Sequence, residues 1–197
     1  MLSLTLVDNN QWIAEGLNHY FSEKPVQIKK IDIDSLNSAL KNIAGCDVLI
    51  SELTAYGRDV QFFTELLRKV KVSSPATRII VLTDLNEKAV VSYVMSVLPG
   101  VIFLAKTSSL DDICDAVVGH ATTQSTRRTK QTLSPREFGL LRLLGQTSNL
   151  TDIAYSLRLS CKTISHHRQS IIRKLNCANN KELFNRLNRM GYQLEKI

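Results

Sequence analysis

Residues 160–175 (SCKTISHHRQSIIRKL) are rich in cations and in neutral hydrogen-bonding side chains, the groups that recognise polyanions. Ile164, Ile171, Ile172 and Leu175 recur at helical spacing, so we expect them to face a core. The other sides would then present groups that suit phosphate oxygens and the base edges of nucleic acid: Lys162, Thr163, Ser165, His166, Arg168, Gln169, Arg173 and Lys174. An ordinary solvated surface helix is the alternative interpretation of this stretch taken alone.

Short elements on both sides would position this helix. Residues 151–157 (TDIAYSL) predict a second helix, and only Arg158, Leu159 and Ser160 separate it from the first. A three-residue link between two helices is typical of a helix-turn-helix, and Ser160 is a suitable N-cap. Residues 181–190 predict a further helix on the C-terminal side.

A strong helix start lies upstream, at the sequence SPRE. Ser134 suits the N-cap, Pro135 suits the first helical position, and Glu137 completes a capping box. Residues 133–197 therefore predict an all-α module of four helices in which the basic helix is the third.

These motifs, LSPRE and TDIAYSLRLSCKTISHHRQSIIRKL, resemble the C-terminal DNA-binding domain of LuxR/NarL/FixJ-type transcription regulators over about residues 133–189. The resemblance implies binding to double-stranded DNA, with Ser165, His166 and Gln169 directed toward base edges. It directs the remaining contacts toward phosphates or the groove rim: Lys162, Thr163, Arg168, Arg173 and Lys174. His167 matches a histidine that is common in the family, and we assign it a mixed role that is partly structural.

Two positions depart from the family pattern. Arg158 stands in a turn where the family usually has glycine, and a positive φ there would cost on the order of 1 kcal/mol. Thr147 stands where the family has a loop glycine before the second helix. Neither departure removes a predicted DNA contact.

The first 120 residues alternate between two periodicities. Strands are predicted at 2–7, 27–33, 46–51, 78–83 and 101–105, and helices at 12–21, 35–43, 62–72, 88–97 and 110–120. This order predicts an α/β domain with a doubly wound, five-stranded parallel sheet, helices on both faces, and 27–33 as the edge strand. The predicted organisation is a receiver-like domain at 1–120, a polar linker at 121–132 and the helical module at 133–197.

Residues 1–120 resemble a response-regulator receiver at the ends of the predicted strands. The matching positions are Asp8 and Asn9 for the acidic pair, Glu52 for the phosphoacceptor, Thr83 and Lys106 for the signalling pair, and Phe103 for the switch aromatic. Asn9 replaces a carboxylate, and Glu52 is longer than the family's aspartate. Because phosphotransfer to these receivers needs Mg²⁺ held at short, inflexible distances, the resemblance with these changes predicts a degenerate site without efficient phosphorylation. Glu52 would instead pair with Lys106, or be an inert polar residue.

Charge separates the two predicted domains. Residues 1–120 carry 11 Lys+Arg and 14 Asp+Glu, a net charge of −3, whereas residues 121–197 carry 14 and 4, a net charge of +10. Positive charge confined to the helical module is typical of a domain that binds a polyanion.

The rest of the composition argues against a membrane protein, a metal-binding protein and an enzyme. No apolar run has the length of a membrane span, and Met1 leads directly into a predicted strand, so we expect a cytoplasmic protein without membrane contact. The four cysteines lack the paired spacing of a metal site. No set of residues suits nucleophilic catalysis, so neither an enzyme nor a cofactor or metal site is predicted.

The whole chain is similar to Rcs-type regulators, including accessory partners of the RcsA and BglJ kind, through CDVLISEL, RIIVLT and KTIS. This resemblance implies a phosphorylation-independent, sequence-specific transcription regulator that acts as a homodimer, or as a heterodimer with an Rcs-type response regulator. The alternatives are an accessory protein with little DNA affinity alone, a conventional phosphorylated response regulator of a two-component system, and a ligand-sensing regulator. The operator, the sign of regulation and the input signal are not encoded in any motif that we identify.

Overall fold

The structure is a computed structural model that describes residues 1–8, 10–31, 43, 45–55, 57–120 and 131–192. The chain divides into two compact units. The first comprises Met1–Tyr56, Phe63–Leu85 and Leu98–Ser125, and the second comprises Gly57–Phe62, Asn86–Val97 and Thr126–Ile197. In the described ranges, no helix is both long enough and apolar enough to cross a membrane.

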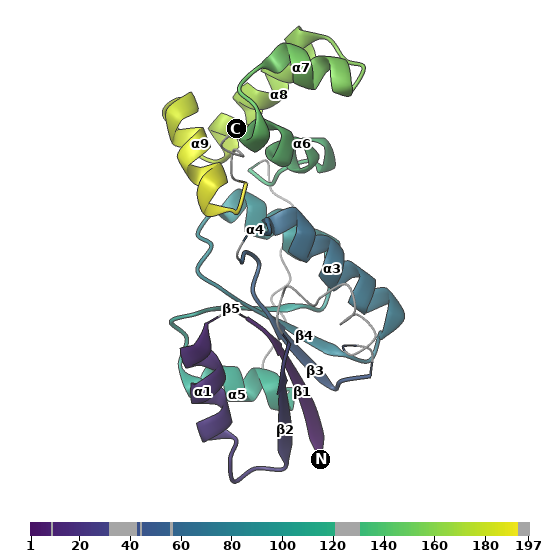
Figure 1. The fold of residues 1–197 in the computed structure, drawn as a ribbon, viewed down its shortest axis with the longest axis vertical. Helices are drawn as coiled ribbons and strands as arrows, with labels where there is room; N and C mark the ends of the chain where they lie inside the picture. The colour runs from purple at the N-terminus through teal and green to yellow at the C-terminus, as the bar shows by residue number, and fades with distance from the viewer. Residues whose placement is uncertain (9, 32–42, 44, 56, 121–130, 193–197) are drawn as a thin grey trace. The chain divides into compact units, whose positions relative to one another are not determined.

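The first unit contains a five-stranded parallel sheet with the order β2-β1-β3-β4-β5. Its strands are β1 (Leu2–Val7), β2 (Val26–Lys30), β3 (Val48–Ser51), β4 (Arg78–Thr83) and β5 (Ile102–Ala105). The sheet and its direction confirm the predicted fold class, and the predicted edge strand at 27–33 is the outermost strand β2 (Figure 1).

Helices cover both faces of this sheet because its central strands are apolar on both sides. These helices are α1 (Gln11–Tyr20), α5 (Leu110–Val118) and α3 (Val60–Ser73), the last of which begins in the second unit. Leu4 and Leu6 of β1 join Leu17 of α1 and Val117 of α5 in one buried cluster. The α3 helix, with Phe63 buried, lies on the other side of the sheet (Figure 1).

The second unit is helical. It contains α4 (Lys88–Val97), α6 (Pro135–Gln146), α7 (Leu150–Ser156), α8 (Cys161–Lys174) and α9 (Asn180–Arg189). The predicted helices at 151–157 and 181–190 each begin one residue earlier than expected, because asparagine side chains provide the caps. Asn149 accepts from the backbone N–H of Thr151, and Asn179 accepts from that of Glu182.

The second unit also includes residues from the first half of the chain. The carboxylate of Asp59 forms a two-point ion pair with Arg142 of α6, at 2.6 and 2.7 Å. The Tyr93 ring of α4 stacks on Phe138 of α6 at a centroid distance of 4.3 Å. These contacts explain why 57–62 and 86–97 group with the C-terminal helices, although the sequence assigns them to the receiver-like domain. The predicted domain boundaries stay a prediction.

Two local predictions are confirmed near the basic helix. Ser134 and Glu137 form the expected capping box at the start of α6, with Pro135 in its first turn. Ser160 caps α8 by accepting from the backbone N–H of Thr163. Arg158, in the turn between α7 and α8, has a φ of +53°, the left-handed conformation that favours glycine.

Three predictions fall outside the described residues. They are the helix at 35–43 apart from Ile43, the side chain of Asn9, and the linker apart from residues 131 and 132.

Candidate nucleic-acid interface

One face of α8 is anchored in the core of the second unit. Ile164, Ile171 and Leu175 are buried, as their helical spacing predicts, whereas Ile172 is half-buried. Ile153 and Ala154 of α7, the helix that contacts α8, are buried as well. Burying three large aliphatic side chains stabilises the helix by several kcal/mol, at roughly 1.5–3 kcal/mol each. The anchored face fixes which side chains of α8 are left for another molecule.

The exposed side of α8 carries four of the predicted contacts. Lys162, His166, Gln169 and Arg173 are exposed and are spaced by four, three and four residues. At 100° per residue they fall within an arc of about 60°, so they form one stripe along the helix. We call these four residues the α8 stripe. It combines two cations with two side chains that both donate and accept hydrogen bonds.

The remaining predicted contacts lie beside the stripe or away from it. Ser165 is half-buried at the edge of the stripe, and the Thr163 hydroxyl lies 2.8 Å from the Ser160 hydroxyl at the helix start. His167 and Arg168 are half-buried on other sides of α8. The Nε atom of Arg168 is buried without a hydrogen-bond partner among the described residues. The structure thus brings together only part of the predicted set.

Lys174 is engaged inside the protein. Its ammonium donates to Glu137 Oε2 at 2.7 Å and to the Thr132 carbonyl oxygen at 3.0 Å. Glu137 also accepts from the Ser170 hydroxyl at 2.6 Å. Sequence reasoning assigned Glu137 only to the capping box and did not identify these contacts with α8. The i, i+4 spacing of Ser170 and Lys174 was the available signal, but nothing in the sequence names their partner.

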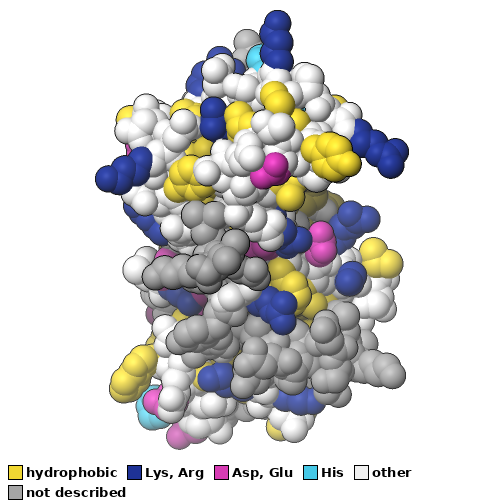
Figure 2. Space-filling view, turned by 45° about the horizontal axis from the view of Figure 1, so that its top comes forward, with side chains coloured by type: hydrophobic (Ala, Val, Ile, Leu, Met, Phe, Trp, Pro, Cys, Tyr) yellow, Lys and Arg dark blue, Asp and Glu magenta, His cyan; other side chains and the backbone are white. Residues whose placement is uncertain are grey.

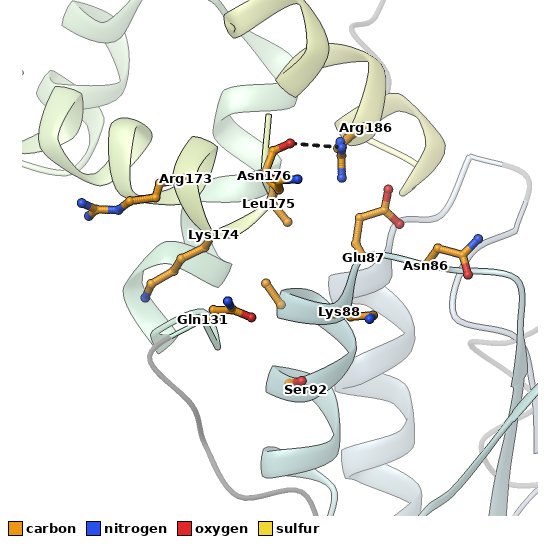
Figure 3. A pocket seen from close by; sticks show the side chains of 11 residues that line it. Asn86, Glu87, Lys88, Ser92, Gln131, Arg173, Lys174, Leu175, Asn176 and Arg186 are labelled. Carbon is orange, nitrogen blue, oxygen red and sulfur yellow. Dashed lines mark hydrogen bonds between the residues drawn. The ribbon is translucent and has the colours of Figure 1, made fainter. Parts of the chain in front are cut away.

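Cationic side chains project from the molecular surface at several points. On the face shown in Figure 2, Lys and Arg side chains stand apart from one another. A histidine is visible near the top of the view, beside the Lys and Arg side chains there. Arg173 and Lys174 also border a cavity of about 510 Å³ within the second unit (Figure 3). Arg173 points away from this cavity.

A second group of predicted residues converges in the first unit. Asp8 follows β1, Glu52 follows β3 and Lys106 follows β5, so all three lie at the carboxyl ends of parallel strands. The Lys106 ammonium forms an ion pair with Glu52 and lies 3.3 Å from Asp8 Oδ2. Both carboxylates are buried, whereas 18% of the Lys106 side chain is exposed. These residues line a cavity of about 500 Å³ with Trp12, which is largely exposed at its edge.

Burial and charge act in opposite directions in this cluster. Burial raises the pKa of Glu52 above its usual value, and this effect outweighs the opposing effect of the Lys106 ammonium. Burial disfavours the charged form of Lys106, but the carboxylates of Glu52 and Asp8 more than compensate and raise its pKa. Lys106 is therefore the protonated counter-ion that two buried carboxylates share.

Two other receiver-like positions, Thr83 and Phe103, lie in β4 and β5. Thr83 ends β4, and its hydroxyl accepts from the Leu85 backbone N–H at 3.2 Å. Phe103 is half-buried in β5, where it pairs in register with Val81. Mg²⁺ prefers near-octahedral oxygen ligands. In the described part of the chain, no three or more His, Cys, Asp or Glu side chains are grouped so that they could hold a metal ion, and both carboxylates here are paired with Lys106.

Comparison with known proteins finds similar transcription regulators. Residues 131–186 match the family of bacterial regulatory proteins, luxR family. The transcriptional regulatory protein RcsB of Escherichia coli (strain K12) is 28% identical over 174 residues, which cover 79% of this chain and 80% of that protein. RcsB of Salmonella typhimurium (strain LT2) gives the same values.

Solved structures of RcsB from Salmonella enterica serovar Typhimurium have the same architecture. The complex with promoter rprA and the phosphomimetic BeF₃⁻ has a TM-score of 0.62 and 25% identity, and the match covers 95% of this chain and 98% of that chain. The complex with promoter P1flhDC has a TM-score of 0.61 and 26% identity, with coverage of 94% and 97%. A further RcsB structure, of two dimers bound to two parallel DNAs, has a TM-score of 0.61 and 26% identity, with coverage of 94% and 98%. The predicted resemblance to LuxR-type response regulators close to the Rcs type is confirmed.

Proposed function

We propose that this chain is a transcription regulator that binds double-stranded DNA. Its residues 131–186 match the luxR family, and its similarity to RcsB extends over 79% of the chain. The observation that carries the proposal is the α8 stripe, because Lys162, His166, Gln169 and Arg173 all face solvent while α8 is anchored behind them. RcsB complexes with promoters support this role for the corresponding module. A regulator of this kind needs no catalytic residue.

Within the stripe we assign different tasks to different side chains. Gln169 and His166, with Ser165 beside them, can hydrogen-bond base edges in a major groove and would read sequence. Lys162 and Arg173 lie toward opposite ends of α8 and would contact phosphates, which fixes the register of the helix. Thr163, His167 and Arg168 would support the helix from its sides.

We further propose that DNA binding does not depend on phosphorylation. The ion pairs of Lys106 with Glu52 and Asp8 support this. Lys106 is already held by a carboxylate at the acceptor position, so its placement does not require a phosphoryl group there. Incubation with acetyl phosphate and Mg²⁺, followed by intact-mass spectrometry, tests the proposal. Escherichia coli RcsB treated identically is the comparison. A phosphate adduct on this protein that strengthens its DNA binding would contradict the proposal.

We propose that the protein acts as a dimer through its receiver-like domain, either with itself or with an Rcs-type response regulator. The structure of two RcsB dimers bound to DNA supports dimeric action in a similar protein. Sedimentation of the full-length chain, alone and mixed with RcsB, distinguishes the two arrangements. A chain that stays monomeric in both samples while bound to DNA would contradict dimeric action.

Selection of DNA from a genomic fragment library tests the central proposal. We expect the full-length protein, alone or with RcsB, to enrich specific fragments. Arg173→Ala should weaken binding to all fragments and lower the salt slope by about one, whereas Gln169→Ala should reduce the preference for enriched fragments. Lys69→Ala, an exposed cation in α3, is the matched control and should change neither. Enrichment only with RcsB present would favour the accessory role, and no enrichment in either sample would reject the proposal.

A further inference from the structure

Glu137 connects the start of α6 to α8 through one buried carboxylate. Oε2 accepts from the Ser134 backbone N–H at 2.6 Å and from the Lys174 ammonium at 2.7 Å, and Oε1 accepts from the Ser170 hydroxyl at 2.6 Å. Glu137 is only 4% exposed, and burial of this kind is tolerated because each contact favours its charged form. We call Glu137, Ser134, Ser170 and Lys174 the Glu137 clamp.

The clamp holds α8 at two points one turn apart. Ser170 and Lys174 are spaced by four residues, so both project from the same side of the helix. Each directly follows a residue of the α8 stripe, since Gln169 precedes Ser170 and Arg173 precedes Lys174. Successive side chains on a helix differ by about 100° in direction. Holding Ser170 and Lys174 inward therefore sets the outward direction of Gln169 and Arg173.

The close-up of this region shows the two directions. Arg173 and Lys174 are adjacent on α8, but Arg173 extends outward while Lys174 turns toward the segment that leads into α6 (Figure 3). The side chain of Lys174 is 19% exposed, and two of the three hydrogens of its ammonium are engaged by Glu137 and Thr132. A phosphate contact would compete with a buried carboxylate that already holds this cation.

We infer that Glu137 is a positioning residue for DNA reading, which sets the rotation of α8 about its own axis and thereby the aim of Gln169 and Arg173. Lys174 acts through Glu137 rather than through a phosphate. This inference rests on the proposed function of the α8 stripe. Glu137 is buried and would act on specificity only through α8, without touching DNA.

The salt dependence of DNA binding separates the two roles of Lys174. Each phosphate contact contributes about 0.9 to the slope of log K against log salt. We expect Lys174→Met, which keeps the aliphatic stem, to leave this slope unchanged in the full-length protein on the scrambled fragment, where the long Arg173 side chain can reach a phosphate without a fixed register of α8. Arg173→Met is the matched control, because Arg173 is adjacent to Lys174 and exposed, and it should lower the salt slope by about one. The probe is the fragment that wild-type protein enriches most, beside a scrambled fragment of the same length.

Sequence preference gives the second measurement. We expect Glu137→Gln and Lys174→Met to reduce the ratio of specific to scrambled affinity about tenfold, and Lys174→Arg to restore most of it. Circular dichroism confirms that each variant is folded before binding is measured. If Glu137→Gln does not fold, Ser170→Ala removes a single hydrogen bond from the same carboxylate and should reduce the ratio about threefold.

The outcomes are distinct. A slope that falls by about one in Lys174→Met would show a phosphate contact and overturn the inference. A preserved affinity ratio in folded clamp variants would make Glu137 a stabilising residue only, and would also overturn it. If wild-type protein enriches no fragment, with or without RcsB, the proposed function itself fails and the inference fails with it.

Discussion

Neutralising Glu137 should destabilise the second unit by an amount that depends on pH. The Glu137→Gln substitution keeps the shape of the side chain and one acceptor, but it removes the charge that pairs with Lys174. Burial opposes ionisation of Glu137, yet the hydrogen bonds from Lys174, Ser134 and Ser170 outweigh it and lower the pKa from 4.5 to about 2.

The magnitude follows from this pKa. Since each pKa unit corresponds to about 1.36 kcal/mol, lowering the pKa from 4.5 to about 2 would stabilise the fold by roughly 3 kcal/mol at most. Lys174 is partly exposed, and solvent screening reduces the expected loss in Glu137→Gln to about 2 kcal/mol at pH 7. Because the pKa is lower in the folded state, this stabilisation is fully present above pH 4.5 and is lost as the pH falls toward about 2.

Urea unfolding of wild-type and Glu137→Gln protein at a series of pH values measures this difference. We expect the two free energies of unfolding to differ by about 2 kcal/mol at pH 7 and to converge near pH 2, where a protonated Glu137 resembles glutamine. Hydrogen exchange of peptides from α6 and α8 assigns the change to the second unit. A difference that stays constant between pH 7 and pH 2.5 would refute the reasoning, because it would then come from packing and not from charge.

Three further changes test other parts of the structure by thermal or urea unfolding. Ile171→Ala should cost about 2–4 kcal/mol, because it empties a fully buried site in the core behind α8; a loss below 1 kcal/mol would contradict that packing. Arg158→Gly should stabilise the protein by about 0.5–1 kcal/mol by relieving the positive φ, while Arg158→Ala, the control, should not. Lys106→Met should destabilise the first unit by about 3 kcal/mol, because Glu52 and Asp8 lose their shared cation, and adding Glu52→Gln should recover part of the loss.

Local sequence patterns specified most of the elements. The capping box at Ser134 and Glu137 depends on residues three apart, so the sequence alone locates the start of α6. The apolar spacing of Ile164, Ile171 and Leu175 likewise determined which face of α8 is buried. Helix starts at 151 and 181 were wrong by one residue, because the capping asparagines precede the apolar pattern that defined each prediction.

The two candidate sites could also be predicted from the sequence only in part. Strand ends in a parallel sheet must meet at one edge, so sequence and topology predicted that Asp8, Glu52 and Lys106 would converge. The exposed stripe on α8 also follows from helical periodicity. The sequence could not show that Lys174 pairs with Glu137, which lies 37 residues away in the chain. A charged side chain near a predicted interface can face outward or inward, and only the distant partner determines which.

The sequence by itself determined the order of the elements, the parallel sheet and the basic helix, because each depends on periodicity, on capping residues or on charge within a short stretch. Only the tertiary structure decided how the charged groups are shared. Lys106 pairs with two carboxylates, those of Asp8 and Glu52, and the carboxylate of Glu137 caps α6 and also binds Ser170 and Lys174 of α8. The physical reason is that a long, flexible charged side chain has several partners within reach, and burial by distant segments selects among them.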